Sequence, residues 1–157
     1  QVLLLASALD EVLDEFGAKV PFNLEFKRGS DGAYPGLPAA TLAEVECRGL
    51  LDKTLFSCFD DAILEELRGL SPRARLAVLV DPRQPEPRNI LERAGRVGAE
   101  AVNPHFLLAS EDLIGEAHAA GCAVYAYTVD ETEVMETLIA RVKKTKTNAE
   151  FLMSVGK

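Results

Sequence analysis

Two residues near the start of the chain, Glu25 and Lys27, have the types and the spacing for phosphate or metal chemistry. They end a segment of alternating apolar and polar residues, 20–27, and a period of two places both side chains on one face of a strand. A carboxylate can ligate a hard cation, and a lysine beside it can hold a phosphate oxygen. The same spacing also suits a plain ion pair that closes the strand end, so both interpretations stay open.

Polar side chains also follow later apolar segments. Ser57 can donate to a ligand or satisfy the backbone, while Asp60 is expected to cap the following helix. His105 follows the apolar segment 99–102, where a histidine can bind phosphate or a metal, or simply lie half-exposed in a loop. His118 lies inside a predicted helix, and we expect it to be solvated.

Two tyrosines lie in the apolar segment 122–129. Tyr125 and Tyr127 share one face of that predicted strand because they are two residues apart. Tyr127 comes near the strand end, where an aromatic ring can pack on a small carbon skeleton. Core packing is the alternative for both rings.

Alternating strands and helices must position these residues. Strands are predicted at 20–27, 54–59, 76–80, 99–102 and 122–129. Helices are predicted from Ser7 to Gly17, from Thr41 to about Leu51, after Asp60, from about Asn89 to Val97, from Ser110 to Gly121, and from about Glu131 to Arg141. Asp130 is expected to cap the last of these helices. The proline-rich segment 81–88 is predicted as a loop. This order is typical of parallel βαβ units with right-handed crossovers. No glycine-rich phosphate loop of the dinucleotide or P-loop type follows a strand.

The composition excludes several classes of protein. The chain has 157 residues with a net charge of −8, and 48% of them are apolar, which argues against disorder. No apolar run approaches the ~18–20 residues of a membrane span, and a net negative chain is a poor binder of nucleic acid. A complete (β/α)8 barrel needs ~200–250 residues. The three cysteines match no zinc pattern; we expect buried free thiols and a cytoplasmic location.

These strand ends, taken in order, resemble the glycerophosphodiester phosphodiesterase family. The matching segments are Leu9–Leu13, Asn23–Lys27, Ser57–Asp60, Val102–Phe106 and Ala119–Val129, so the resemblance runs from about residue 7 to 141. It implies a TIM-type barrel that hydrolyses glycerophosphodiesters to glycerol 3-phosphate and an alcohol with a divalent cation, Mg²⁺ or Ca²⁺. In that mechanism the cation polarises the phosphoryl group while a pair of histidines transfers protons.

The resemblance assigns roles to individual residues. Glu25 takes the place of a metal-ligating glutamate, and Lys27 that of a lysine near the phosphate. Tyr127 takes the place of a frequent tryptophan near the substrate. Ser57 and His105 complete the candidate substrate-binding residues.

The chain also departs from the family pattern. The family's His-Arg-Gly, Glu-Asn-Thr, Glu-x-Asp and His-Asp segments do not occur, nor does its closing strand, and His105 and His118 match neither catalytic histidine. We therefore expect an α/β partial barrel at 1–141, without its first strands and its closing strand, followed by a divergent basic tail at 142–157. Without catalytic residues, the chain alone is expected to be inactive.

Two alternatives to catalysis stay open. One is a non-catalytic half-barrel that associates with itself or with a complementing chain, because open strand edges invite pairing. The other is a small anion-binding α/β domain of the flavodoxin-like kind. The expected partners are a glycerophosphodiester substrate and a second copy or complementing chain, without nucleic acid.

Overall fold

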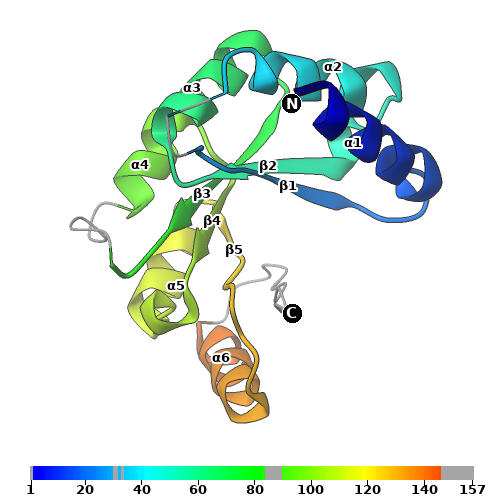
Figure 1. Cartoon of the computed structure of the whole chain (residues 1–157). Helices are drawn as coiled ribbons and strands as arrows, with labels where there is room; N and C mark the ends of the chain where they lie inside the picture. Colours follow the sequence, from blue (N-terminus) through cyan, green and yellow to red (C-terminus); the bar gives the residue numbers. More distant parts are fainter. Residues whose placement is uncertain (1, 30–31, 33, 84–89, 146–157) are drawn as a thin grey trace. The chain divides into compact units, whose positions relative to one another are not determined.

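Helices and parallel strands alternate along the chain (Figure 1). The computed structural model describes residues 2–29, 32, 34–83 and 90–145. The chain divides into two compact units, residues 1–76 and 77–157, and the division falls inside a strand. The predicted α/β class is confirmed, because every strand pair with a defined register is parallel.

The first unit is built on two parallel strands. Its elements are α1 (Val2–Phe16), β1 (Phe22–Phe26), α2 (Leu37–Cys47), the short 3-10 helix η1 (Leu51–Lys53), β2 (Thr54–Cys58) and α3 (Asp61–Leu70). In the β1–β2 pair Phe22 lies opposite Thr54, and Phe26 opposite Cys58. Helix α2 packs against both α1 and α3, along one side of the strands (Figure 1).

The core of the first unit lies where α3 meets β2. Phe56, Leu64 and Leu67 are completely buried, and the rings of Phe56 and Phe26 lie 6.2 Å apart. Helix α3 forms here because Asp60 accepts a hydrogen bond from the Ala62 N–H, which confirms the predicted cap.

The second unit continues the same pattern. It holds most of β3 (Arg75–Val80), then α4 (Ile90–Val97), β4 (Ala101–Pro104), the 3-10 helix η3 (Phe106–Leu108), α5 (Glu111–Ala119), β5 (Ala123–Val124) and α6 (Thr132–Lys144). Strand β4 pairs in parallel with β3 and β5, so that Ala77, Ala101 and Ala123 lie side by side. Small side chains at this level allow α4 to pack on β4 and α5 on β5.

Two predicted helix starts are wrong. Helix α1 begins at Val2 instead of Ser7, and α2 begins at Leu37 instead of Thr41. A glycine with a φ of 76° and a proline in the first turn start α2, and these override the capping-box pattern of Thr41, which is buried within the helix. Helix α2 also ends at Cys47, earlier than predicted.

The last predicted strand is much shorter than expected. Regular pairing ends at Val124, although the N–H groups of Tyr125 and Tyr127 still donate to Val102 and Pro104 of β4. Thr128 then has a φ of 57°, which turns the chain away from the strand direction.

The final helix and the predicted tail also differ from expectation. Glu131, not Asp130, precedes the first turn of α6, and its side chain makes no capping hydrogen bond. Because α6 continues to Lys144, the start of the predicted tail is helical; residues 146–157 lie outside the described residues, as do 84–88 of the predicted loop and Asn89.

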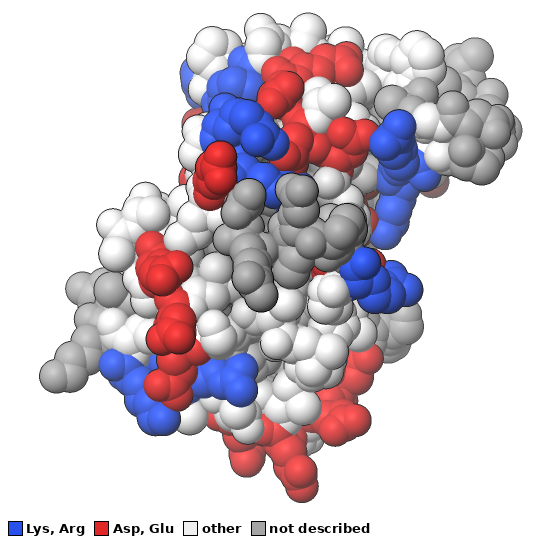
Figure 2. Space-filling view, turned by 90° about the vertical axis from the view of Figure 1, so that its left-hand side faces the viewer, with Lys and Arg blue, Asp and Glu red and all other residues white. Residues whose placement is uncertain are grey.

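No helix among the described residues is long and apolar enough to cross a membrane. On the face drawn in Figure 2, acidic and basic side chains are adjacent in some groups, while the group at the lower right edge is acidic alone.

Candidate functional site

Glu25 and Lys27 form an ion pair at the carboxyl end of β1. The Lys27 Nζ lies 2.6 Å from the Glu25 Oε1, and the lysine side chain is 74% exposed, against 31% for the glutamate. The structure therefore brings the two predicted residues together. The pair closes the strand end and at the same time leaves the ammonium group open to an anion.

A hollow of about 340 Å³ adjoins this pair. All residues from Asn23 to Lys27 line it, together with side chains from α1, α2 and the loop before α2, among them Leu9, Tyr34 and Leu37. Most of its wall is apolar. A phosphorylated ligand held at Lys27 could place a carbon skeleton in this space.

Ser57 lies beside Glu25 in the parallel pair of β1 and β2. Its side chain is completely buried, and its Oγ has no hydrogen-bond partner among the described residues. The alternative in which Ser57 satisfies backbone groups is therefore not observed. A buried hydroxyl without a partner is costly, so this atom is a candidate ligand contact.

Cys58 and Asp60, which follow Ser57 in the chain, have structural roles. The Cys58 Sγ donates to the Phe26 carbonyl at 3.2 Å and accepts from the Asp60 N–H at 3.3 Å, and burial raises the pKa of this thiol. Asp60 caps α3 and also pairs with Arg28 at 3.2 Å. The prediction of buried thiols holds for Cys58 but is wrong for Cys47, which is exposed.

His105 and Tyr127 lie together in the second unit. Their rings meet edge to face at 5.3 Å, and the two residues form an isolated parallel bridge. The Tyr127 hydroxyl donates to the Val80 carbonyl at 2.9 Å, so this ring is anchored at the end of β3. His118, in contrast, is half-buried in α5, and burial lowers its pKa. The prediction that His118 is solvated is wrong.

The hydrogen bonding of His105 bears on the choice between phosphate and metal. Its Nδ1 accepts from the Leu107 N–H at 3.3 Å, which starts η3. In the neutral ring the proton must then lie on Nε2, which makes Nε2 a donor. A donor suits a phosphate oxygen, whereas a metal would need a lone pair there.

Asp81 and Arg83 form a second charged pair that the sequence interpretation missed. Arg83 Nη2 lies 2.6 Å from Asp81 Oδ2, and Nε contacts both carboxylate oxygens. The Arg83 hydrogen bonds hold the pKa of Asp81 at about 2, and His105 contributes to that shift. The available signal was an aspartate directly after the buried strand β3, but the surrounding prolines led to its interpretation as a loop.

Asn103 is a buried polar residue that the sequence interpretation did not include among the site residues. It lies in β4, opposite Leu79 of β3, and its Oδ1 has no partner among the described residues. Its position two residues before His105 could have marked it.

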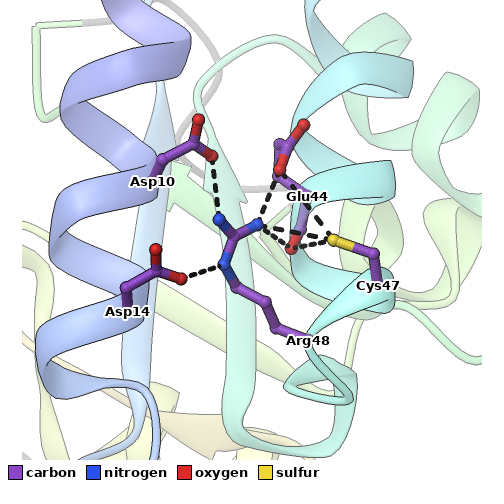
Figure 3. Close-up of polar contacts among 5 residues, drawn as sticks. All are labelled: Asp10, Asp14, Glu44, Cys47 and Arg48. Atoms are coloured by element: carbon purple, nitrogen blue, oxygen red, sulfur yellow. Dashed lines mark hydrogen bonds and ion pairs between the residues drawn. The ribbon is translucent and has the colours of Figure 1, made fainter.

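Arg48 joins α1 to α2 beside the hollow. Figure 3 shows its guanidinium between Asp10 and Asp14 of α1 and Glu44 of α2. Nε donates to Asp14 at 2.6 Å, Nη1 to Glu44 at 2.6 Å, and Nη2 to Asp10 at 3.2 Å. Hydrogen bonding to Arg48 lowers the pKa of Glu44, while burial and the Glu44 contact raise the pKa of Asp10.

The predicted site residues thus form two groups, one in each unit. Glu25, Lys27 and Ser57 belong to the first, and His105 and Tyr127 to the second. Their roles in substrate binding stay predictions.

The divalent cation implied by the resemblance finds too few ligands. Glu25 supplies one carboxylate, which already holds Lys27, and the described part of the chain has no group of three or more His, Cys, Asp or Glu side chains that could hold an ion. Mg²⁺ and Ca²⁺ bind with several oxygen ligands. These residues alone therefore do not fit the ion, and the assignment of Glu25 as a ligand stays a prediction.

Comparison with known proteins gives a consistent result. The profile of the glycerophosphoryl diester phosphodiesterase family matches residues 5–144. No curated protein matches the chain.

Three solved structures show the same fold. A protein from Galdieria sulphuraria assigned as a glycerophosphodiester phosphodiesterase has a TM-score of 0.76 and 20% identity, over 93% of this chain and 59% of that one. A protein from Silicibacter pomeroyi with the same assignment has a TM-score of 0.74 and 24% identity, and the match covers 96% of this chain and 52% of that one. A phosphodiesterase from Oleispira antarctica, in complex with the product sn-glycerol-3-phosphate, has a TM-score of 0.58 and 23% identity. That match covers 90% of this chain and 54% of the other. The chain thus spans little more than half the length of these structures.

Proposed function

Because the chain belongs to the glycerophosphoryl diester phosphodiesterase family, we propose that it carries part of the site for hydrolysis of glycerophosphodiesters to glycerol 3-phosphate and an alcohol. The observation that carries this proposal is the pair of Glu25 and Lys27 at the carboxyl end of β1, beside an apolar hollow. Ligands bind at the carboxyl ends of parallel strands in α/β folds.

Each site residue has a proposed role in substrate binding. Lys27 binds a phosphate oxygen, and Glu25 orients the ammonium group through their ion pair. His105 donates from Nε2 to a polar oxygen of the substrate, and Tyr127 packs on the glycerol carbons. Ser57 supplies a buried hydroxyl that has no hydrogen-bond partner among the described residues. The product bound to the Oleispira antarctica relative supports glycerol 3-phosphate as the ligand to test.

We further propose that the 157-residue chain has no activity by itself. The family's histidine segments and its Glu-x-Asp pair are not in the sequence, so proton transfer and most metal ligands would come from elsewhere. Among the described residues β1 pairs only with β2, which favours the alternative of a half-barrel that associates with another chain.

Binding of glycerol 3-phosphate to the full chain tests the site. We expect chemical-shift changes at Lys27 and Glu25 on titration, and a loss of binding of about tenfold or more in Lys27→Met, because a charge-assisted hydrogen bond is removed. Lys19→Met is the matched control: Lys19 pairs with Glu15 in a similar exposed ion pair outside the lining of the hollow. Equal loss in both variants, or no binding to the unaltered chain, contradicts the proposal.

Turnover is tested separately with glycerophosphocholine and Mg²⁺ or Ca²⁺. We expect no release of glycerol 3-phosphate by the chain alone. Metal-dependent release would overturn the proposed inactivity, and Glu25→Ala would then test the metal assignment, since an unchanged rate excludes Glu25 as a ligand.

A further inference from the structure

The parallel ladder of the second unit continues past the carboxyl ends of its strands. The His105 N–H donates to the Val80 carbonyl at 3.0 Å, and the Tyr127 N–H donates to the Pro104 carbonyl at 3.1 Å. These bonds extend the register of β3, β4 and β5 by a further level. Asp81, His105 and Tyr127 therefore lie side by side, and their side chains share one face of the sheet.

Asn103 lies on the same face, one level deeper. It precedes His105 by two residues in β4, so both side chains leave the strand on the same side. Leu79 of β3 lies opposite Asn103, and the register of β4 with β5 places Tyr125 on its other side. The Asn103 residue is only 3% exposed.

The amide oxygen of Asn103 lacks a hydrogen-bond partner in the described part of the chain. This oxygen can only accept, so its partner must carry a hydrogen. Leu79, directly beside it, has no polar side-chain atom. A buried acceptor without a partner is costly, and its retention in a strand of the core calls for an explanation.

His105 places a donor close to this acceptor. Its Nδ1 accepts from the Leu107 N–H, so in the neutral ring Nε2 carries the proton. Residues two apart in a strand are separated by about 6–7 Å, which places the acceptor and the donor along one line of the sheet face. A carbon chain with hydroxyl groups on adjacent carbons complements them, because one hydroxyl can donate to Asn103 while the next accepts from His105.

Other parts of a glycerophosphodiester match Asn103 less well. An ionised phosphate oxygen carries no hydrogen, so it cannot donate to the amide oxygen. A quaternary ammonium group has no N–H and cannot donate either. The hydroxyl groups of the glycerol moiety are therefore the partners that this acceptor favours.

We propose that Asn103 is a specificity-determining residue, whose Oδ1 accepts a hydrogen bond from a hydroxyl of the glycerol moiety while His105 Nε2 donates to the neighbouring hydroxyl. This inference rests on the proposed function, which places His105 and Tyr127 at the substrate. Because Oδ1 is covered in the structure, binding rotates the amide toward His105.

Two phosphates that differ only in their hydroxyl groups test the proposal. Calorimetric titration of the full chain with glycerol 3-phosphate and with propyl phosphate should show about tenfold or more tighter binding of the first, because a site built for a hydroxyl rejects the analogue without it. Asn103→Leu has the same branched shape without the acceptor. It should bind glycerol 3-phosphate about tenfold more weakly and propyl phosphate unchanged. Asn103→Ala should act alike, and its smaller side chain cannot overfill the core.

Thr54→Val is the matched control in the other unit. The buried Thr54 hydroxyl donates to the Leu50 carbonyl at 2.9 Å, at the amino end of β2. Its loss should lower the free energy of unfolding and leave the ratio of the two affinities unchanged. The side-chain NH2 signals of Asn103 should also shift with glycerol 3-phosphate and not with propyl phosphate, which a purely structural role would not produce.

Each outcome bears on a different proposal. Equal binding of both phosphates by the unaltered chain overturns the role of Asn103 and leaves the phosphate site intact, as does a preference that both Asn103 variants retain. Loss of both ligands in both variants would show that Asn103 only supports the fold, which also overturns its role in specificity. Binding of neither phosphate to the unaltered chain contradicts the proposed function and removes this inference with it.

Discussion

Arg48 donates through its Nε to the Oδ1 of Asp14 at 2.6 Å, although the two residues lie 34 positions apart. This contact joins the residue after α2 to the last turn of α1. The same guanidinium also donates to Asp10 and Glu44, so carboxylates from two helices surround it (Figure 3).

The Arg48 contacts should hold α1 in place. We expect Arg48→Met to raise the pKa of Glu44 toward its ordinary value, because the arginine hydrogen bond is the main cause of its lowering. Amide exchange in α1 should also become faster. Arg48→Lys keeps the charge but loses the planar fork, so it should behave like Arg48→Met in exchange. Unchanged exchange in both variants would show that α1 is held by its apolar contacts alone.

Asp81 should make the fold sensitive to acid. Its pKa of about 2 lies below the ordinary value of 3.8 because of Arg83. A lowered folded pKa contributes stability that is present above pH 3.8 and is lost as the pH falls through 2. Carboxyl NMR should give the value directly, and Arg83→Ala should move it upward. A value near 3.8 in the unaltered chain would contradict the ion pair.

Ser57→Ala should separate stability from binding. The variant removes a buried hydroxyl for which the described part of the chain offers no partner, so the free energy of unfolding should stay within about 1 kcal/mol or rise. If Ser57 contacts the ligand, glycerol 3-phosphate should bind more weakly at the same time. A clear loss of stability would show that the hydroxyl is satisfied in solution.

The tautomer of His105 can be observed by ¹⁵N NMR. The neutral ring should carry its proton on Nε2, because Nδ1 accepts from the Leu107 N–H. His118 serves as the internal comparison in the same spectra. A proton on Nδ1 of His105 would remove the argument that this ring donates to phosphate.

Leu138 should be important for the packing of α6. It is buried with Ala109, Ala126 and Val129. Leu138→Ala should therefore lower the free energy of unfolding by about 2–5 kcal/mol. Ile139→Ala, at the exposed neighbouring position, should cost about 0.5 kcal/mol or less, measured by urea unfolding. Similar effects at both positions would contradict the orientation of α6.

The sequence predicted the strands best where side chains are buried on both faces. Leu76–Val80 was predicted as a strand because a short, continuous apolar run has few alternatives, and β3 covers it. Caps that lie next to such strands were also confirmed, as at Asp60. The start of α2 was wrong because two capping patterns compete there, and local residue types do not say which one the tertiary packing favours.

The site was less predictable than the fold. Glu25 and Lys27 could be paired from their spacing, because a strand has a fixed period. The contact of Asp81 with Arg83 depends on a turn, whose geometry the proline-rich sequence did not reveal. The hydrogen bond from Leu107 to His105 depends on η3, which no periodicity predicted. Contacts that depend on irregular backbone therefore could not be predicted from the sequence and became visible only in the structure.

Cys47 differs from the other two cysteines because it is exposed, while Cys58 is buried and Cys122 is partly buried. Its sulfur also lies 3.4 Å from the Arg48 Nη1, where α1 and α2 meet. The chain thus offers a native attachment point for a fluorophore or spin label at this junction. Spectroscopy at that single thiol could follow helix separation in real time without any engineered cysteine.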